Sequence, residues 1–126
     1  MTGITYDAGA LIAAERNDRL LWSMHRAAVR RGVPRTVPAA VLAQVWRGDP
    51  QNQLSRLLRS CTVEHLTETE ARAAGALCGA AGTSDVVDAA LVIGAIDRDD
   101  AVVTSDPDDI GRLAKASGAS LVIHRV

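Results

Sequence analysis

Short apolar runs alternate along the chain with longer segments in which apolar residues recur at helical spacing. Runs of strand length occupy residues 3–6, 33–37, 101–104 and 120–124, and 61–65 fits either a strand or an extended connection. The longer segments predict helices over about 8–16, 19–31, 38–46, 54–58, 67–78, 85–97 and 106–117. Because strands and helices alternate, we expect one α/β domain over residues 1–126, with a parallel sheet flanked by helices.

Residues suited to helix ends mark several of these boundaries. Asn17 or Asp18 can cap the helix at 19, and Gly32 suits its left-handed C-cap. The pair Thr67 and Glu70 has the spacing of a capping box.

Other boundaries are expected from single residues. Pro38 is expected at the first helical position, where its missing N–H costs nothing, and Thr83 or Ser84 is expected to cap the helix at 85. The segment 47–50, which contains Gly48, Asp49 and Pro50, should break a helix. The glycines at 75 and 79 are expected to allow close packing between helices.

Composition narrows the class of protein. Hydrophobic residues make up 48% of the 126 positions but aromatic residues only 2%, so the core must be aliphatic. The net charge of −1 gives no overall indication of nucleic-acid or membrane binding, although charge can be distributed locally. Two arginine clusters, 26–35 and 47–59, are interpreted as solvated helix faces in preference to a binding patch. Without a signal-like start or an apolar run long enough to span a bilayer, a cytoplasmic protein with free thiols at Cys61 and Cys78 is expected.

Aspartates stand where the predicted strands end and the predicted helices begin. Asp7 follows the first strand, Asp106 follows the strand 101–104, and Asp109 lies three residues further on. Asp85 and Asp88 open the helix before that strand. Each of the later acids is also explained by helix capping. If the two strands are neighbours, however, their carboxyl ends share one edge of the sheet and the carboxylates converge there.

Converging carboxylates repel one another unless a cation neutralises them. With oxygen ligands and no nearby His or Cys, Mg²⁺ or Mn²⁺ is favoured over Zn²⁺. Such an ion activates water and stabilises a leaving oxygen, so the pattern indicates hydrolysis of a phosphodiester.

Three other phosphate-handling classes do not fit the chain. A haloacid-dehalogenase-like phosphatase needs a second acid two residues after the first, where this sequence has Gly9. A dinucleotide-binding fold needs a glycine-rich loop after a strand, and none is present. A receiver domain needs a late strand-end lysine, whereas Lys115 falls within a predicted helix.

The acidic motifs, in their order and spacing, resemble those of PIN domains, and in particular of VapC-like ribonuclease toxins from type II toxin–antitoxin pairs. The resemblance covers the chain and rests on Asp7 in ITYDAGALI, Asp88 in DAALVIGA, and Asp106 with Asp109 in TSDPDDI. It implies a three-layer PIN-like fold and a Mg²⁺- or Mn²⁺-dependent endoribonuclease. It also implies an RNA substrate, an antitoxin partner and a homodimer. No association with a membrane is expected.

One position departs from the family pattern. The third helix of the family usually carries a glutamate, and the matching segment AQVWRG has Gln44 there. Glutamine offers a neutral oxygen but no charge, so metal affinity should fall unless Asp85 compensates. Two functions follow: an active nuclease in which Gln44 orients water or substrate, and a degenerate PIN domain that binds a protein or RNA without cutting it. A DNA-directed nuclease is a third hypothesis.

For several other residues, the sequence is compatible with both a functional and a purely structural role. Thr104 and Ser105 can hold a phosphate or a water, or can bond to the backbone. Arg47 can face substrate or complement the dipole at a helix end. Trp22 and Trp46 can lie in an interface or in the core. The three histidines, His25, His65 and His124, are expected at the surface or in packing, not as bases.

Overall fold

Five parallel strands build the central sheet, in a computed structural model that describes residues 2–48 and 50–126. Their order across the sheet is β3-β2-β1-β4-β5. The strands are β1 (Ile4–Tyr6), β2 (Arg35–Pro38), β3 (Thr62–Glu64), β4 (Ala101–Thr104) and β5 (Ile123–Arg125). Thr5 of the central β1 is in register with Thr36 on one side and Val102 on the other. The chain therefore winds outward from β1 in both directions, with a switch point between β1 and β4.

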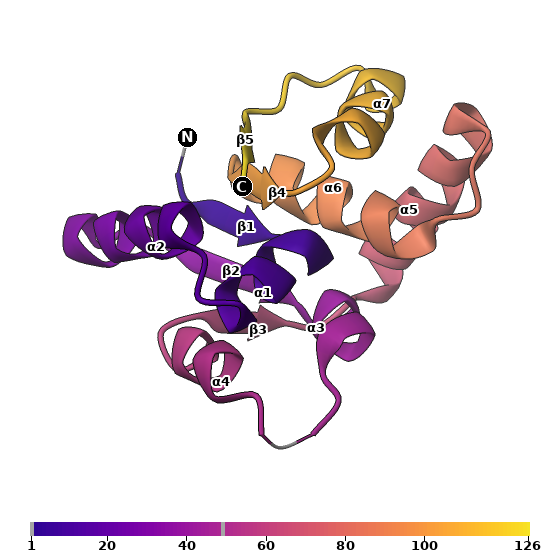
Figure 1. Ribbon diagram of the computed structural model, residues 1–126. Helices are drawn as coiled ribbons and strands as arrows, with labels where there is room; N and C mark the ends of the chain where they lie inside the picture. The colour runs from indigo at the N-terminus through magenta and orange to yellow at the C-terminus, as the bar shows by residue number, and fades with distance from the viewer. Residues whose placement is uncertain (1, 49) are drawn as a thin grey trace.

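Helices cover both faces of this sheet. They are α1 (Ala8–Glu15), α2 (Arg19–Arg31), α3 (Ala39–Val45), α4 (Asn52–Leu58), α5 (Glu68–Ala81), α6 (Val86–Arg98) and α7 (Pro107–Ser117). In Figure 1, α2 and α4 lie on one side of the sheet and α5 and α6 on the other. The prediction of a parallel sheet between helices is confirmed. In the part of the chain described, no single helix is long and apolar enough to cross a membrane, although α5 and α6 meet that test as a pair bent by 114°.

The core is aliphatic, as the composition predicts. All residues of β1 and β4 are buried, which requires cover on both faces. From α6, Ala89, Leu91 and Val92 are fully buried. Trp22 belongs to this core and donates its indole N–H to the carbonyl of Ala14 at 3.0 Å.

Most helix ends predicted from local residues are confirmed. Asp18 caps α2 by accepting from the Leu21 amide at 2.9 Å, and Gly32 ends the helix with φ of 67°. Thr67 and Glu70 form the capping box at the start of α5.

Other boundaries differ from the prediction. Pro38 is not the first residue of α3; it closes β2, where it pairs with Glu64 of β3, so its extended backbone places it before the helix. The cap of α6 is Asp85 and not Thr83 or Ser84, which moves the start of α6 to Val86. Asp49, in the predicted break at 47–50, lies outside the described residues.

Two further expectations are corrected. The last strand begins at Ile123 and not at residue 120, because only residues 123–125 pair with β4. Gly75 and Gly79 do not mediate close packing: a Cβ added at either would meet no atom within 4 Å, since both face outward on α5. The segment 61–65 does contain a strand, β3.

A buried polar network fastens α6 to the sheet at the amino ends of β1 and β4. Asp100, 4% exposed, accepts a hydrogen bond from Thr5 Oγ1 at 2.9 Å and an ion-pair contact from Arg98 Nε at 3.1 Å. Arg98 also donates to Thr5 Oγ1 at 3.0 Å. Because one carboxylate joins the end of α6 to β1, the opposite end of α6, with Asp85 and Asp88, is held at the carboxyl edge of the sheet.

We expect Arg98→Met to lower the free energy of unfolding by about 3 kcal/mol, because Asp100 would keep a buried charge without its partner. The matched control is Arg72→Met, which removes an exposed ion pair with Glu68 on α5 and should cost about 0.5 kcal/mol. Urea denaturation of the two variants measures the difference. Equal losses would show that Asp100 does not depend on Arg98.

Candidate acidic site

Three aspartates begin three helices at one edge of the sheet. Asp7 directly follows β1 and caps α1, with Oδ1 accepting from the Ala10 amide at 3.2 Å. Asp85 caps α6 by accepting from the Asp88 amide at 3.0 Å, and Asp106 caps α7 in the same way. Capping therefore explains part of each residue's position, but it occupies only one oxygen of each carboxylate, and helix N-termini favour negative charge.

Thr104 connects the two acids that follow β1 and β4. Its Oγ1 donates to Asp7 Oδ2 at 2.5 Å and accepts from the Asp106 amide at 2.9 Å. The Asp7 amide in turn donates to the carbonyl of Val103 at 3.1 Å. These bonds follow from the parallel pairing of β1 with β4, which places Asp7 and Asp106 at the switch point, where ligands bind in open α/β sheets.

The charges of four carboxylates act on one another across this edge. Burial, the charge and hydrogen bond of Asp85, and the charges of Asp7 and Asp106 together raise the pKa of Asp88 to about 7, with burial the largest cause. Burial is also the main cause that raises the pKa of Asp7, opposed by the bonds from Thr104 and backbone amides and reinforced by Asp106. The structure thus brings Asp7, Asp85, Asp88 and Asp106 into one electrostatic neighbourhood.

Asp109 lies at the margin of this group. It forms an ion pair with Arg112 on the next turn of α7. With Asp85, Asp88 and Thr83, these two residues line a cavity of about 110 Å³. Among the predicted acids, Asp109 therefore already has its negative charge neutralised by the Arg112 guanidinium.

Of the residues predicted to orient substrate or water, all of which lie in the described part of the chain, only Thr104 has a hydrogen bond to one of the acids. Gln44 is exposed on α3, and its backbone carbonyl accepts from Arg47 at 2.8 Å. The Arg47 guanidinium also donates to the carbonyls of Ala43 and Trp46, so it satisfies the open carbonyls at the end of α3. Of the two hydroxyls, Thr104 is buried and bonded to Asp7, whereas Ser105 is exposed.

Gly9 is part of the site, although from the sequence it served only as an argument against a haloacid-dehalogenase-like phosphatase. A Cβ built on Gly9 would lie 1.8 Å from Ser105 Oγ and 2.7 Å from Ser105 Cβ. The missing side chain allows the loop after β4 to approach the first turn of α1. The one signal available in the sequence was a glycine two residues after Asp7.

The donor set fits a hard divalent cation by its chemistry. Its donors are carboxylate oxygens, and, after burial, the negative charges of Asp85, Asp7 and Asp106 contribute to the raised pKa of Asp88. Within residues 2–48 and 50–126, no three His, Cys, Asp or Glu side chains are already assembled as a ligand set for a metal ion. The acids are therefore gathered in one region without being preorganised as ligands.

Comparison with known proteins shows similarity to solved structures and not to known sequences. No family model matches the chain, and no curated protein matches its sequence. Among solved structures, the chain is similar to the crystal structure of VapBC2 from Rickettsia felis bound to a DNA fragment from their promoter, with a TM-score of 0.72 over 98% of each chain and 12% identity. This similarity establishes the architecture: the chain has a PIN-like α/β fold.

The raised pKa of Asp88 predicts how stability depends on pH. The folded protein holds this proton more tightly than the unfolded chain, whose carboxyl titrates near 3.8, so stability falls as pH rises from about 4 to about 7. Asp88→Asn should remove that loss and gain roughly 1 kcal/mol above pH 7, once solvent screening is allowed for, with little gain near pH 4. Urea midpoints at the two pH values measure it.

The matched control for this prediction is Asp97→Asn, which removes the same charge from the exposed far end of α6. It should not reproduce the pH-dependent gain. If both variants respond alike, net charge and not the acidic neighbourhood governs the effect.

Proposed function

We propose that this protein is a Mg²⁺- or Mn²⁺-dependent endoribonuclease of the VapC type, the toxin of a type II toxin–antitoxin pair. The observation that carries the proposal is the convergence of Asp7, Asp85, Asp88 and Asp106 at the switch point of a PIN-like sheet, where neighbouring acids help to raise the pKa of Asp88 and of Asp7. A folded chain keeps several uncompensated carboxylates together at a cost in stability, which a bound divalent cation would offset.

The roles follow from the contacts of each side chain. Asp7 is held by Thr104 and the α1 amides, so it is the fixed ligand, and Asp88 and Asp106 complete the set from α6 and α7. Asp85 and Asp109 flank them. The cation, when bound, would supply an activated water and charge stabilisation at the leaving oxygen. Asp88, with a pKa of about 7, loses its proton readily near neutrality as the site is loaded.

A partner protein is part of this proposal. The similar solved structure is that of VapBC2 from Rickettsia felis, so we infer an antitoxin partner for this chain as well. Trp46, 38% exposed at the end of α3, is a candidate contact residue for that partner or for a second copy of the chain. Trp22, by contrast, is committed to the core.

The second candidate function is a degenerate PIN domain that binds RNA or a protein without cleavage. Gln44 favours it, because this side chain is exposed and carries no charge. The absence of a preassembled ligand set among the described residues favours it as well.

Cleavage assays separate the two functions. We expect the purified chain to cut single-stranded RNA with Mg²⁺ or Mn²⁺ and not with a chelator. Asp7→Asn and Asp88→Asn should each lower the rate by about 100-fold or more, which corresponds to about 3 kcal/mol of transition-state stabilisation. The control is Asp108→Asn, an exposed neighbour on α7, which should remain active.

The other possible results of this assay favour other functions or contradict the proposed site. Metal binding without cleavage of varied RNAs supports the degenerate domain. Preferential cleavage of DNA in competition with RNA supports a DNA-directed nuclease. Cleavage that persists in both Asn variants contradicts the acidic site.

Gln44→Glu tests whether α3 takes part. If the side chain can reach the carboxylates, an added charge should tighten Mn²⁺ binding roughly tenfold in calorimetric titration without RNA. Asn52→Asp adds the same charge on exposed α4 and should leave the affinity unchanged. Equal affinities of wild type and Gln44→Glu would place residue 44 outside the site.

A further inference from the structure

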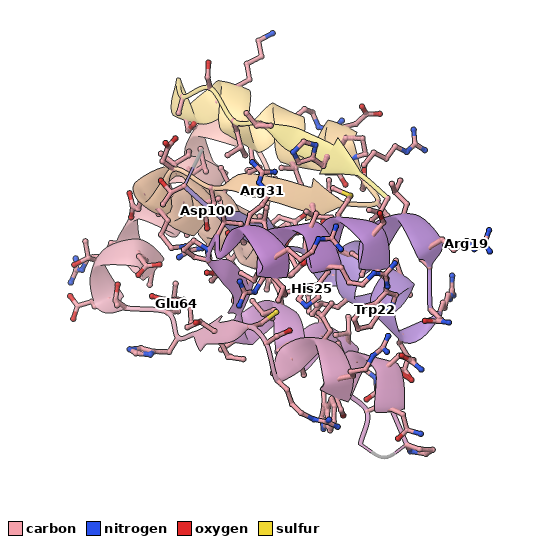
Figure 2. All side chains as sticks on the ribbon, turned by 90° about the vertical axis from the view of Figure 1, so that its left-hand side faces the viewer. Arg19, Trp22, His25, Arg31, Glu64 and Asp100 are labelled. Atoms are coloured by element: carbon pink, nitrogen blue, oxygen red, sulfur yellow. The ribbon has the colours of Figure 1, made fainter. Side chains whose placement is uncertain are left out.

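The charges of this chain are divided between its two halves. Residues 1–63 carry nine arginines and four acids, whereas residues 64–126 carry five basic and eleven acidic residues. The fold turns this division into two different faces. Helix α2, which contains four arginines, lies with α4 on one side of the sheet, and Figure 2 views that side, with α2 in front of the strands.

A cavity of about 340 Å³ opens between α2 and α4 on this basic face. Three exposed arginines line it, Arg26 and Arg30 from α2 and Arg56 from α4. Its lining, drawn from the described residues, contains no Asp or Glu, and no ion pair occupies these three guanidinium groups there. Arg56 is held 4.0 Å above the ring of Trp22, which positions its charge at the cavity wall.

The histidine at the base of the cavity is held neutral. Ser60 Oγ donates to the Leu57 carbonyl at 3.1 Å, so it accepts from His25 Nε2, 2.7 Å away. The opposite nitrogen, Nδ1, accepts from the Tyr6 hydroxyl at 2.7 Å. Burial, together with the charges of Arg35, Arg56 and Arg26, lowers the pKa of His25 to about 4. Three arginine charges therefore act on His25, and the described residues that line the cavity include no acid.

We propose that the α2–α4 cavity binds the phosphodiester backbone of single-stranded RNA and anchors the substrate outside the acidic site. The inference rests on the proposed nuclease function. An acidic centre repels RNA, so the substrate needs cations elsewhere on the protein. Arg26 and Arg30 stand one helical turn apart on the same side of α2 and can contact successive phosphates.

The orientation of α2 supports this assignment. The helix ends at Arg31, close to the amino end of β2, so it runs opposite to the strands. Figure 2 places Arg31 and Asp100 toward one end of α2 and Arg19 at the other end. An RNA strand lying along α2 toward Arg19 therefore approaches the carboxyl edge of the sheet, where Asp7 and Asp106 lie.

An acidic peptide is the competing occupant, and the cavity suits it less well. A peptide segment generally needs an apolar anchor at the centre of its interface. Trp22 is only 6% exposed and its ring is covered by Arg56, which leaves Val29 as the exposed apolar residue of the lining. The cavity offers cations more than apolar contact area.

The test measures binding without cleavage. Fluorescence anisotropy of a labelled single-stranded RNA is recorded over a salt series in chelator, for wild type and for Arg26→Gln/Arg30→Gln. Losing two phosphate contacts should reduce the slope of log K against log salt by about 1.4. The control is Arg72→Gln/Lys115→Gln, which removes two exposed charges from α5 and α7.

The outcomes distinguish this inference from the proposed function. A smaller slope in the α2 variant alone supports the cavity as the RNA anchor, even if the chain proves inactive as a nuclease. Equal changes in both variants indicate non-specific attraction and overturn the inference, as does an unchanged slope. Tighter binding of an acidic peptide than of RNA, lost in the α2 variant, would assign the cavity to a protein partner instead.

Discussion

The parallel pairing of β1 with β4 is the constraint on which the site depends. Residues 6 and 103 are partners in that ladder, although almost a hundred positions separate them in the chain. The pairing brings the ends of the two strands together, and Thr104 then bonds at once to the Asp7 carboxylate and to the Asp106 amide. A shift of one residue in this register would turn Thr104 to the other face and separate the two acids.

The acidic neighbourhood works against the stability of the fold that creates it. Burial and like charge both raise the pKa of Asp88, so at neutral pH the protein carries a carboxyl group that is unfavourable to ionise. Three helix N-termini offset part of this cost, because each cap supplies an amide to one oxygen. The remaining cost is consistent with a site shaped for a ligand and not for stability alone.

What the sequence could predict depended on how local each cause is. Gly32 and the pair Thr67–Glu70 fix helix ends through bonds within a few residues, and these predictions were confirmed. The parallel sheet followed from the alternation of elements. The contact of Gly9 with Ser105 could not be predicted, because it depends on which strands are neighbours. The cavity between α2 and α4 has the same origin, since Arg26 and Arg56 meet only in the folded chain.

The fold places groups of opposite charge on different surfaces of the molecule. Arg26, Arg30 and Arg56 line one face on α2 and α4, whereas α6 and α7 begin at aspartates, so the fold separates a basic face from the acidic carboxyl edge of the sheet. A protein with a net charge of −1 can therefore attract a polyanion at one surface while its acidic edge stays available for a cation. The net charge does not reveal this arrangement, because it sums over two surfaces of opposite sign. Arg26, Arg30 and Arg56 are exposed, as expected of solvated helix faces, and they line one cavity only because α2 and α4 share one side of the sheet.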